Sequence, residues 1–331
     1  MEGYYMNDKY QDLLAQYDLE VHSSFRSKGT FQFETSQGLA ILSEYRSSLQ
    51  RLALEHEWKT ALYEAGFTET DRYFVSKEDS LVVYDRYHTP FVLRHYFRGR
   101  ECDCSSRKDI HDATKNLARL HLVSDQIPVP SGMHTQAEPI ESLFFRKNRE
   151  LRQIRRFVSR VPMKRSFELL YMAHFDSFYE EACLALESLN QKKGSDAAPK
   201  NGICHGSYHH HNILFLPDGR TATVGFTSLC YGPRLMDLYL FMRKVMEKNR
   251  YDYSFYESGI KGYAELVPLT GEDHRFLYYL FLYPEKFWKI SNRYYNHRKS
   301  WVSPKMEEKL NRLLDQSADR QHFLKKLARA L

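Results

Sequence analysis

One stretch of the chain has the residue types and the spacing that phosphoryl transfer uses. It reads His205-Gly206-Ser207-Tyr208-His209-His210-His211-Asn212, and a little later the chain reads Val224-Gly225-Phe226. In enzymes that transfer phosphoryl groups, a loop of the form H-x-D-x-x-x-x-N precedes a turn whose aspartate binds the metal ions at the phosphates. The spacing therefore predicts a loop of this kind at 205–212 and a turn of this kind at 224–226.

Neither aspartate of that arrangement is present. Ser207 stands at the position of the base, and near pH 7 a hydroxyl group does not accept a proton as a carboxylate does. Gly225 stands at the position of the metal ligand and has no side chain to bind an ion. The loop keeps His205, which we expect to pack beneath the loop and order it. Asn212 is also kept, and either binds a cation or, as we favour, ties the loop backbone together.

A third group is missing from an earlier strand. A lysine that holds the α- and β-phosphates belongs on the strand predicted at 39–45, and Ser43 occupies its position by pattern. Glu55 or Glu57 on the following helix would be its ion-pair partner, and we expect neither to have a lysine. Loss of a general base alone lowers a rate by about 10²–10⁴. Loss of all three groups predicts a site with activity close to background.

The elements that would position these residues begin with a strand-rich segment. Alternating side chains predict two strands within 30–45, joined by a turn at Ser36-Gln37-Gly38. A helical pattern at 48–65 ends at Gly66, a suitable residue for a helix C-terminus. Strand-like runs follow at 80–84 and 90–96. The segment Phe97-Arg98-Gly99-Arg100 is predicted to be a hinge.

After the hinge, the patterns are helical except for one hairpin. Helices are predicted at 109–123 and 167–190, the segment 192–201 is predicted to be a loop, and a turn at Pro217-Asp218-Gly219-Arg220 predicts the hairpin. We therefore predict an α+β fold with two lobes. The smaller, residues 1–98, holds an antiparallel sheet and one helix, and the larger, residues 99–331, is helical.

Composition and targeting signals narrow the class of protein. The chain has 331 residues, of which 42% are hydrophobic and 27% charged, as is typical of soluble globular proteins. Its first residues lack the basic and apolar segments of a secretory signal, and no apolar run is long enough to span a bilayer. The five cysteines form no C-x-x-C pair, which favours reduced thiols over a disulfide framework. We expect a protein of a reducing compartment.

Positive charge is concentrated at 146–160, where Leu151, Ile154, Phe157 and Val158 recur at helical spacing. This pattern predicts a basic amphipathic helix. Its charged face could contact an acidic partner, a membrane surface or nucleic acid, but a solvated helix face explains it more simply. Because no nucleic-acid-binding motif accompanies it, we expect neither nucleic acid nor membrane as a partner.

Several stretches resemble the CotS/CotI family of bacterial spore coat proteins, whose fold is similar to that of aminoglycoside and choline phosphotransferases. The resemblance extends from about the first strands to the C-terminus and is weakest in the small lobe. The stretches Pro-Glu-Lys-Phe-Trp and Asn-Arg-Tyr-Tyr are the most specific to the family. Family members usually have aspartate at the positions of Ser207 and Gly225. The stretches that carry the resemblance are 97–102, 204–212, 231–238 and 283–296.

The resemblance implies a protein-kinase-like fold with a nucleotide-shaped cleft between the lobes. ATP with Mg²⁺ would be the cofactor if the cleft still binds nucleotide. The implied partners are other spore coat proteins and a small molecule in the cleft, and the implied location is the mother-cell cytoplasm and then the spore coat. The residues assigned to the site are Ser207, His205 and Asn212 on the catalytic side, and Ser43, Glu55, Phe97 and Gly225 on the cofactor side.

Other interpretations of the loop are less favoured. Its four histidines suggest a metal site, but adjacent histidines point in different directions and only Cys204 could complete the set. Ser207 as a nucleophile lacks the G-x-S-x-G flanks. Asp237 is expected to brace the loop, as in the related phosphotransferases, and less plausibly to serve as a metal ligand.

Three hypotheses about function remain open. The first is an inactive kinase-like scaffold or binding module of the spore coat. The second is an active phosphotransferase rewired through Asp237, Asn212 or a loop histidine, acting on a small molecule or a coat protein. The third is a sensor whose lobes close on a nucleotide or another small ligand.

Overall fold

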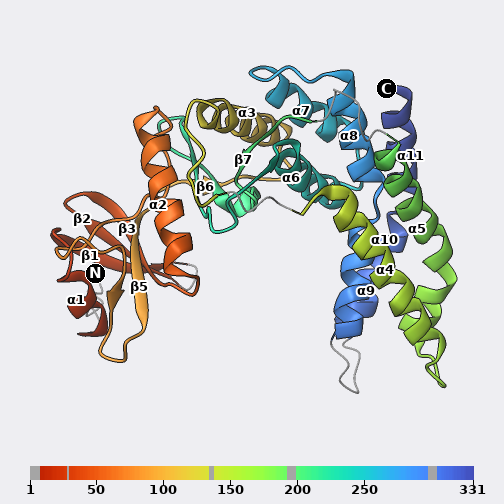
Figure 1. Ribbon diagram of the computed structural model, residues 1–331, viewed down its shortest axis with the longest axis horizontal. Coiled ribbons are helices and arrows are strands. Elements are labelled where there is room, and N and C mark those ends of the chain that lie inside the picture. Colours follow the sequence, from red (N-terminus) through yellow and green to blue (C-terminus); the bar gives the residue numbers. More distant parts are fainter. Residues whose placement is uncertain (1–7, 28–29, 134–137, 192–198, 297–303) are drawn as a thin grey trace.

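The computed structural model describes residues 8–27, 30–133, 138–191, 199–296 and 304–331. It has two lobes (Figure 1). The smaller is built on a five-stranded antiparallel sheet with the strand order β1-β2-β3-β5-β4. Its elements are α1 (Asp8–Leu14), β1 (Val21–Ser27), β2 (Thr30–Thr35), β3 (Gly38–Glu44), α2 (Leu49–Glu64), β4 (Val83–Tyr84) and β5 (Pro90–His95).

The two faces of this sheet pack against different helices. In the β3–β5 pair, Leu42 lies opposite Leu93 and Ser43 lies opposite Val92. Because side chains alternate along a strand, the two pairs project from opposite faces. Leu42 and Leu93 pack in a cluster with the leucines of α1, whereas Val92 packs with Leu52 of α2. Ser43 therefore lies on the face that α2 covers.

Helix α2 joins the two lobes. The Ser48 hydroxyl caps its first turn by accepting a hydrogen bond from the Arg51 backbone N–H at 3.2 Å, and Gly66 follows its end with a φ of +91°. These boundaries confirm the helix predicted at 48–65. Trp58 and Leu62 are buried in the core of the larger lobe, although the helix follows the small sheet in the sequence. The helix therefore contributes side chains to the apolar clusters of both lobes.

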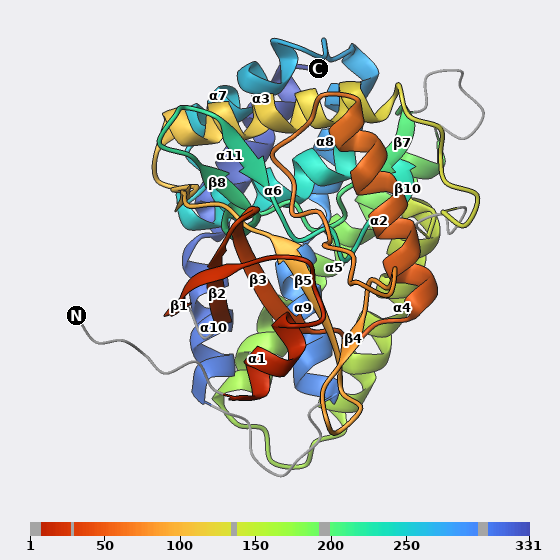
Figure 2. The ribbon, with the colours of Figure 1, turned by 90° about the vertical axis from the view of Figure 1, so that its left-hand side faces the viewer.

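The larger lobe is mostly helical, with short strands near the junction between the lobes (Figure 2). Its main core is a single large apolar cluster that runs through most of its helices. Its elements are β6 (Arg100–Glu101), α3 (Arg107–Ser124), α4 (Ile140–Ser159), α5 (Ser166–Asn190), β7 (Asn201–Cys204), a 3₁₀ turn (His210–Asn212), β8 (Ile213–Phe215), β9 (Thr221–Thr223), β10 (Cys230–Pro233), α6 (Leu235–Lys248), α7 (Tyr253–Ala264), α8 (Gly271–Leu282), α9 (Glu285–Asn296), α10 (Pro304–Asp315) and α11 (Ser317–Arg329).

The predicted hairpin is confirmed by β8 and β9, which pair antiparallel around the turn that contains Gly219. The expectation of one hairpin in an otherwise helical lobe is wrong, because β7 pairs with β10 and β6 pairs with β8. These strands have only two to four residues each, too few for alternation to be recognised in the sequence. Helix α1 and strand β1 were also missed. Of the loop predicted at 192–201, residues 192–198 lie outside the described part of the chain.

Helix α4 confirms the amphipathic pattern at 146–160, with two exceptions. Leu151, Ile154 and Val158 are buried, but Phe157 is 37% exposed. Lys147 was counted with the charged surface, yet it is buried and its Nζ lies 2.6 Å from Glu285 Oε2. No helix in the described segments has both the length and the apolar character that crossing a membrane requires.

Helix α7 crosses α3 at a glycine, and this crossing gives a test of the packing. A Cβ at Gly262 would overlap the His111 carbonyl oxygen and lie 2.5 Å from Thr114 Oγ1. We expect Gly262→Ala to lower the free energy of unfolding by about 1–3 kcal/mol, because the added methyl group forces the helices apart. Urea unfolding measures this. The matched control is Gly271→Ala, whose Cβ would meet nothing nearer than Arg275 at 3.7 Å; equal effects of the two changes would contradict the prediction.

Candidate active site

The loop at 205–212 connects β7 to β8, and a buried aspartate fixes its backbone. Asp237, in the first turn of α6, accepts hydrogen bonds from the backbone N–H groups of His205 at 2.6 Å and Gly206 at 2.9 Å. Its carboxylate also lies 3.4 Å from Nε2 of the buried His121. These contacts confirm the bracing role expected for Asp237.

Ser207 and Asn212 face each other across this loop. The Asn212 side-chain amide donates to the Ser207 carbonyl oxygen at 3.0 Å and lies 3.3 Å from His209 Nε2. Asn212 thus ties the loop backbone together, as the favoured interpretation expects. Its proposed role as a metal ligand stays a prediction. Both side chains are partly exposed, and Ser207 presents only a hydroxyl group where a base would stand.

His205 is buried beneath the loop. Its Nε2 lies 3.1 Å from the Val224 carbonyl oxygen, and its Nδ1 accepts the Ser207 N–H at 3.2 Å. Its ring lies 4.3 Å from that of Phe226, which in turn lies 5.3 Å from the ring of Trp58 on α2. The three rings form a column that connects the loop, the turn and the helix between the lobes.

The turn at Gly225 receives a carboxylate from a distant part of the chain. The Gly225 N–H donates to Asp71 Oδ2 at 3.0 Å. Asp71 lies in the segment after α2, which runs beside β9: Thr70 bridges to Thr223, whose N–H donates to the Glu69 carbonyl at 2.9 Å. A carboxylate is therefore present at the Gly225 turn, and it comes from the segment between α2 and β4.

Two cations already neutralise Asp71. Lys59 Nζ lies 3.0 Å from Asp71 Oδ1, and Arg94 Nη1 lies 2.9 Å from Oδ2. The side chains of Lys59 and Asp71 are only 1% and 2% exposed. We call Lys59, Asp71 and Arg94 the junction cluster. They come from α2, from the segment after it and from β5, and they meet at the Gly225 turn of the larger lobe. These contacts put fixed cations beside the carboxylate.

Charge governs the protonation of this cluster. Burial acts to raise the pKa of Asp71, but Lys59, Arg94 and the Gly225 N–H together outweigh it and lower that pKa. Burial also lowers the pKa of Lys59, and the nearby Arg94 adds to this, against the attraction of Asp71 and Glu55. Asp71 is therefore held in its charged carboxylate form, and this charged form depends on both cations.

Glu55 is buried on the same face of α2 and is not without cationic partners. Its carboxylate lies 3.4 Å from Arg51 Nε and 3.8 Å from Lys59 Nζ, and it accepts the Tyr73 hydroxyl at 2.6 Å. The lysine near this glutamate comes from its own helix, one turn on, and not from β3, where Ser43 stands. Arg51 also donates to the Thr227 carbonyl at 3.2 Å, just beyond the turn.

The remaining assigned residues lie around this junction. Ser43 is on the α2 side of β3, and Arg94 projects from the same sheet face, opposite Ile41. The cation on this face thus comes from β5. Phe97 is partly buried against Leu214 and other apolar residues of the β8–β9 hairpin. Its place in a hinge and its role in binding a cofactor both stay predictions.

The loop histidines do not form a recognisable metal site. His211 Nδ1 lies 2.6 Å from Glu101 Oε2, and His210 Nε2 lies 3.0 Å from Lys248 Nζ. Burial first, and then His211 and Lys248, lower the pKa of His210 to about 4. Within the described residues, no three histidine, cysteine or acidic side chains are grouped as metal ligands.

Sequence reasoning missed the junction cluster. Glu55 and Lys59 are four residues apart on a helix, a spacing that pairs charges on one face, so one member of the cluster, Lys59, carried a visible signal. Asp71 and Arg94 carried none, because nothing in the local pattern around Thr68-Glu69-Thr70-Asp71-Arg72 shows that a carboxylate reaches a turn more than 150 residues away.

The junction cluster predicts a large loss of stability when its anion is removed. Asp71→Asn leaves two cations without their shared carboxylate, and breaking a buried pair in this way costs about 3–5 kcal/mol. In a Lys59→Met background the same change should cost less, because the more deeply buried cation is already gone. Urea unfolding of the four proteins gives the coupling. An equal cost in both backgrounds would show that the residues do not act together.

The buried His205 predicts a loss of stability in acid. Burial lowers its pKa from 6.5 to about 4, more strongly than Asp237 and the Val224 carbonyl raise it. The folded state therefore resists protonation, so the contribution of His205 to stability is complete above about pH 6.5 and declines as the pH falls towards 4. We expect that in His205→Gln the free energy of unfolding changes less steeply with pH in this window, by up to about 1.4 kcal/mol per pH unit. Unfolding free energies measured from pH 7 to 4.5 test this; parallel curves for the two proteins would contradict it.

Comparisons with known proteins agree with this architecture. The family described as "Spore coat putative kinase YutH" matches residues 10–327. An aminoglycoside phosphotransferase from Alicyclobacillus acidocaldarius has a TM-score of 0.82 at 17% identity, with 100% of this chain and 97% of that chain covered. No curated protein matches the chain.

Two further solved structures show the same fold at lower similarity. Spectinomycin phosphotransferase APH(9)-Ia, in complex with ADP and spectinomycin, has a TM-score of 0.67 at 14% identity, covering 94% of each chain. Choline kinase LicA from Streptococcus pneumoniae has a TM-score of 0.52 at 10% identity, covering 94% of this chain and 97% of that chain. The predicted protein-kinase-like α+β fold and the resemblance to spore coat proteins related to these phosphotransferases are confirmed. The chain belongs to the kinase-like spore coat family described as "Spore coat putative kinase YutH".

Proposed function

We propose that this protein is a catalytically inactive member of its kinase-like family, a pseudokinase that serves the spore coat as a scaffold or a ligand-binding module. The observation that carries the proposal is the junction cluster. Phosphoryl transfer uses metal ions bound by a carboxylate at the turn. Here the carboxylate at the turn, Asp71, is buried, and both of its oxygens are already paired with the fixed cations Lys59 and Arg94.

The catalytic loop supports the same proposal. It is well ordered by Asp237 and Asn212, yet it offers Ser207 as its only group at the base position. The backbone is kept and the proton acceptor is missing. A protein with this arrangement can still bind a ligand between its lobes, but it lacks the groups that activate a nucleophile and hold Mg²⁺.

Asp71 also supports a second candidate, the rewired phosphotransferase. A carboxylate does reach the turn, and displacement of Lys59 by a bound Mg²⁺ would make Asp71 a metal ligand. This candidate needs the junction cluster to open, at the cost of leaving a buried lysine without its partner. We favour the inactive protein because the closed cluster satisfies the charges without a ligand.

The two candidates differ in their response to magnesium. For the inactive protein we expect no ATP turnover above background with Mg²⁺ or Mn²⁺, measured by release and transfer of labelled γ-phosphate. Any rise in melting temperature with ATP should be the same with Mg²⁺ as with EDTA, because ligand binding stabilises by mass action whatever holds the phosphates. Turnover that requires Mg²⁺ and is lost in Asn212→Ala would overturn the proposal.

Ser207→Asp sharpens the test by restoring only the base. We expect this variant to remain inactive, because the metal ligand at Gly225 is still absent. If it gains turnover that requires both Mg²⁺ and Asp71, then Asp71 serves as the metal ligand and the rewired enzyme is correct. The change Gly225→Asp is less informative, because a Cβ at this position would lie 2.8 Å from the Asn212 amide nitrogen.

A further inference from the structure

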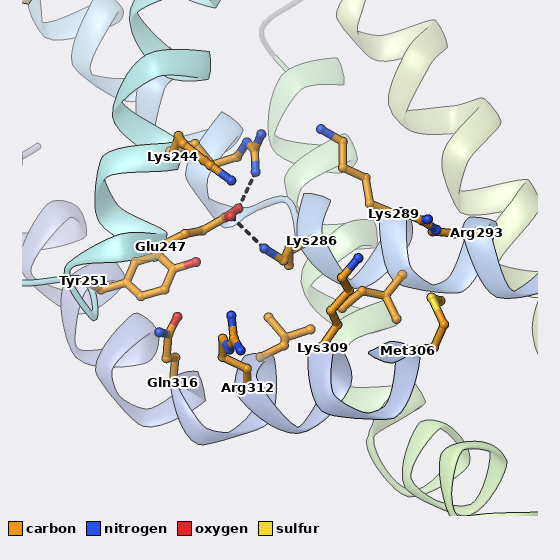
Figure 3. A pocket seen from close by; sticks show the side chains of 13 residues that line it. Lys244, Glu247, Tyr251, Lys286, Lys289, Arg293, Met306, Lys309, Arg312 and Gln316 are labelled. Atoms are coloured by element: carbon orange, nitrogen blue, oxygen red, sulfur yellow. Dashed lines mark hydrogen bonds and ion pairs between the residues drawn. The ribbon is translucent and has the colours of Figure 1, made fainter. Parts of the chain in front are cut away.

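A cavity of about 410 Å³ lies in the larger lobe between α6, α9 and α10 (Figure 3). Its volume falls in the range of small-molecule sites. Ile290, Met306 and Leu313 form an apolar part of its wall. Seven basic side chains and one acidic side chain, Glu247, supply its charge; the basic ones are Arg243, Lys244, Lys286, Lys289, Arg293, Lys309 and Arg312.

The positive charge of this cavity is not balanced. Glu247 is shared between Arg243 and Lys286, whose Nζ lies 2.9 Å from Glu247 Oε2. Lys244, Lys309 and Arg312 form no ion pair with any carboxylate in the described part of the chain. Figure 3 shows Lys309 and Arg312 projecting from α10 towards the side that α6 and α9 line. The cations thus converge on a space with too few anions.

The lowered pKa values of two lysines in this cavity reflect both their burial and repulsion by neighbouring cations. Burial lowers the pKa of Lys289, and the neighbouring Arg243 lowers it further, against the attraction of Glu285. Lys244 has its pKa lowered by burial and by Lys286 and Arg243, against the attraction of Glu247. Like charges at close range cost free energy. A bound anion would relieve that cost, so the cavity is prepared for one.

A second cavity shows that basic lining alone does not produce this excess. It has a volume of about 870 Å³ and is lined by the hinge, α3 and the β8–β9 hairpin. Each of its six basic side chains forms an ion pair with a described carboxylate, such as Lys108 with Asp112 and Lys115 with Glu265 at 2.9 Å. Of these two cavities, it is the one between α6, α9 and α10 in which several cations lack such partners among the described residues.

The family-specific stretch at 284–288 holds this cavity in shape. Glu285 pairs with the buried Lys147 and lies 3.4 Å from Lys289. Phe287 is fully buried against aromatic rings of α5, and the Trp288 indole N–H donates to Glu150 at 2.8 Å. The backbone that carries Lys286 and Lys289 is therefore fixed by packing, which preorganises their ammonium groups for a ligand.

The cavity borders the altered catalytic loop through α6. Lys244 lines the cavity, and one turn further Lys248 contacts His210 of the loop at 3.0 Å. A ligand in the cavity therefore lies on the loop side of the larger lobe. Such a ligand must be negatively charged, because the seven basic groups would repel a polycation such as an aminoglycoside.

We propose that this cavity is a binding site for a small polyanion that carries several phosphate groups. Compact phosphates satisfy many ammonium and guanidinium donors at once, and a volume of about 410 Å³ suits a small molecule. The inference goes beyond the proposed function, because binding requires neither ATP nor catalysis. It stands even if the protein proves to be an active enzyme.

The test uses inorganic tripolyphosphate as the probe, titrated into the full-length protein without metal and followed by calorimetry. We expect binding that weakens as salt is added. The double variant Lys309→Gln/Arg312→Gln should bind about tenfold more weakly, as the loss of two exposed charged contacts predicts. Both side chains are exposed and unpaired, so the variant should fold normally; its melting temperature without ligand verifies this.

The matched control is Lys108→Gln/Lys115→Gln, which removes the same charge from the other cavity and should leave the affinity unchanged. Kanamycin, a polycation, should not bind. Absence of tripolyphosphate binding, or equal affinities for the two double variants, would overturn the proposal. Poly-glutamate binding that depends on Lys309 and Arg312, without tripolyphosphate binding, would also overturn it in favour of an acidic protein partner.

Discussion

A single buried carboxylate, Asp71, determines how the two lobes of this protein meet. It contacts Lys59 on α2, Arg94 on β5 and the backbone of Gly225 in the larger lobe. The side chains of Lys59 and Asp71 are 1% and 2% exposed and that of Arg94 is 20% exposed, so water screens these charges little and they must compensate one another. Breaking such a pair costs about 3–5 kcal/mol, a large share of the roughly 5–15 kcal/mol that stabilises a typical domain. The cluster therefore fixes both the joint between the lobes and the conformation of the turn.

The fold was predictable because its larger features have strong local signals. The helix at 48–65 has a capping serine and a terminal glycine, and the hairpin around Gly219 has a recognisable turn. The short strands were not predictable. Asn201–Cys204 and Cys230–Pro233 are stabilised by pairing with each other across the loop and the hairpin, and this long-range pairing leaves no period in the sequence.

The loop of the site was predictable from the sequence, but the contacts at the turn were not. The spacing of His205, Ser207 and Asn212 indicated the loop, and Gly225 indicated a turn without its carboxylate. That Asp71 reaches this turn depends on the pairing of its segment with β9, which only the folded chain shows. Burial along the helix predicted at 167–190 likewise depends on the folded chain: Leu169 is 58% exposed, because the neighbours of α5 set which of its faces is buried.

The two charge clusters of the protein have opposite physical characters. In the junction cluster, cations and a carboxylate satisfy one another, so no ligand is needed to stabilise it. In the cavity between α6, α9 and α10, Lys244, Lys309 and Arg312 face other cations without forming ion pairs to described carboxylates, and Glu285 and Phe287 hold the backbone of that wall in place. Repulsion that packing maintains is a cost to the free protein. Such a cost is understandable where an anionic ligand offsets it, so binding in this lobe does not depend on whether the loop beside it supports phosphoryl transfer.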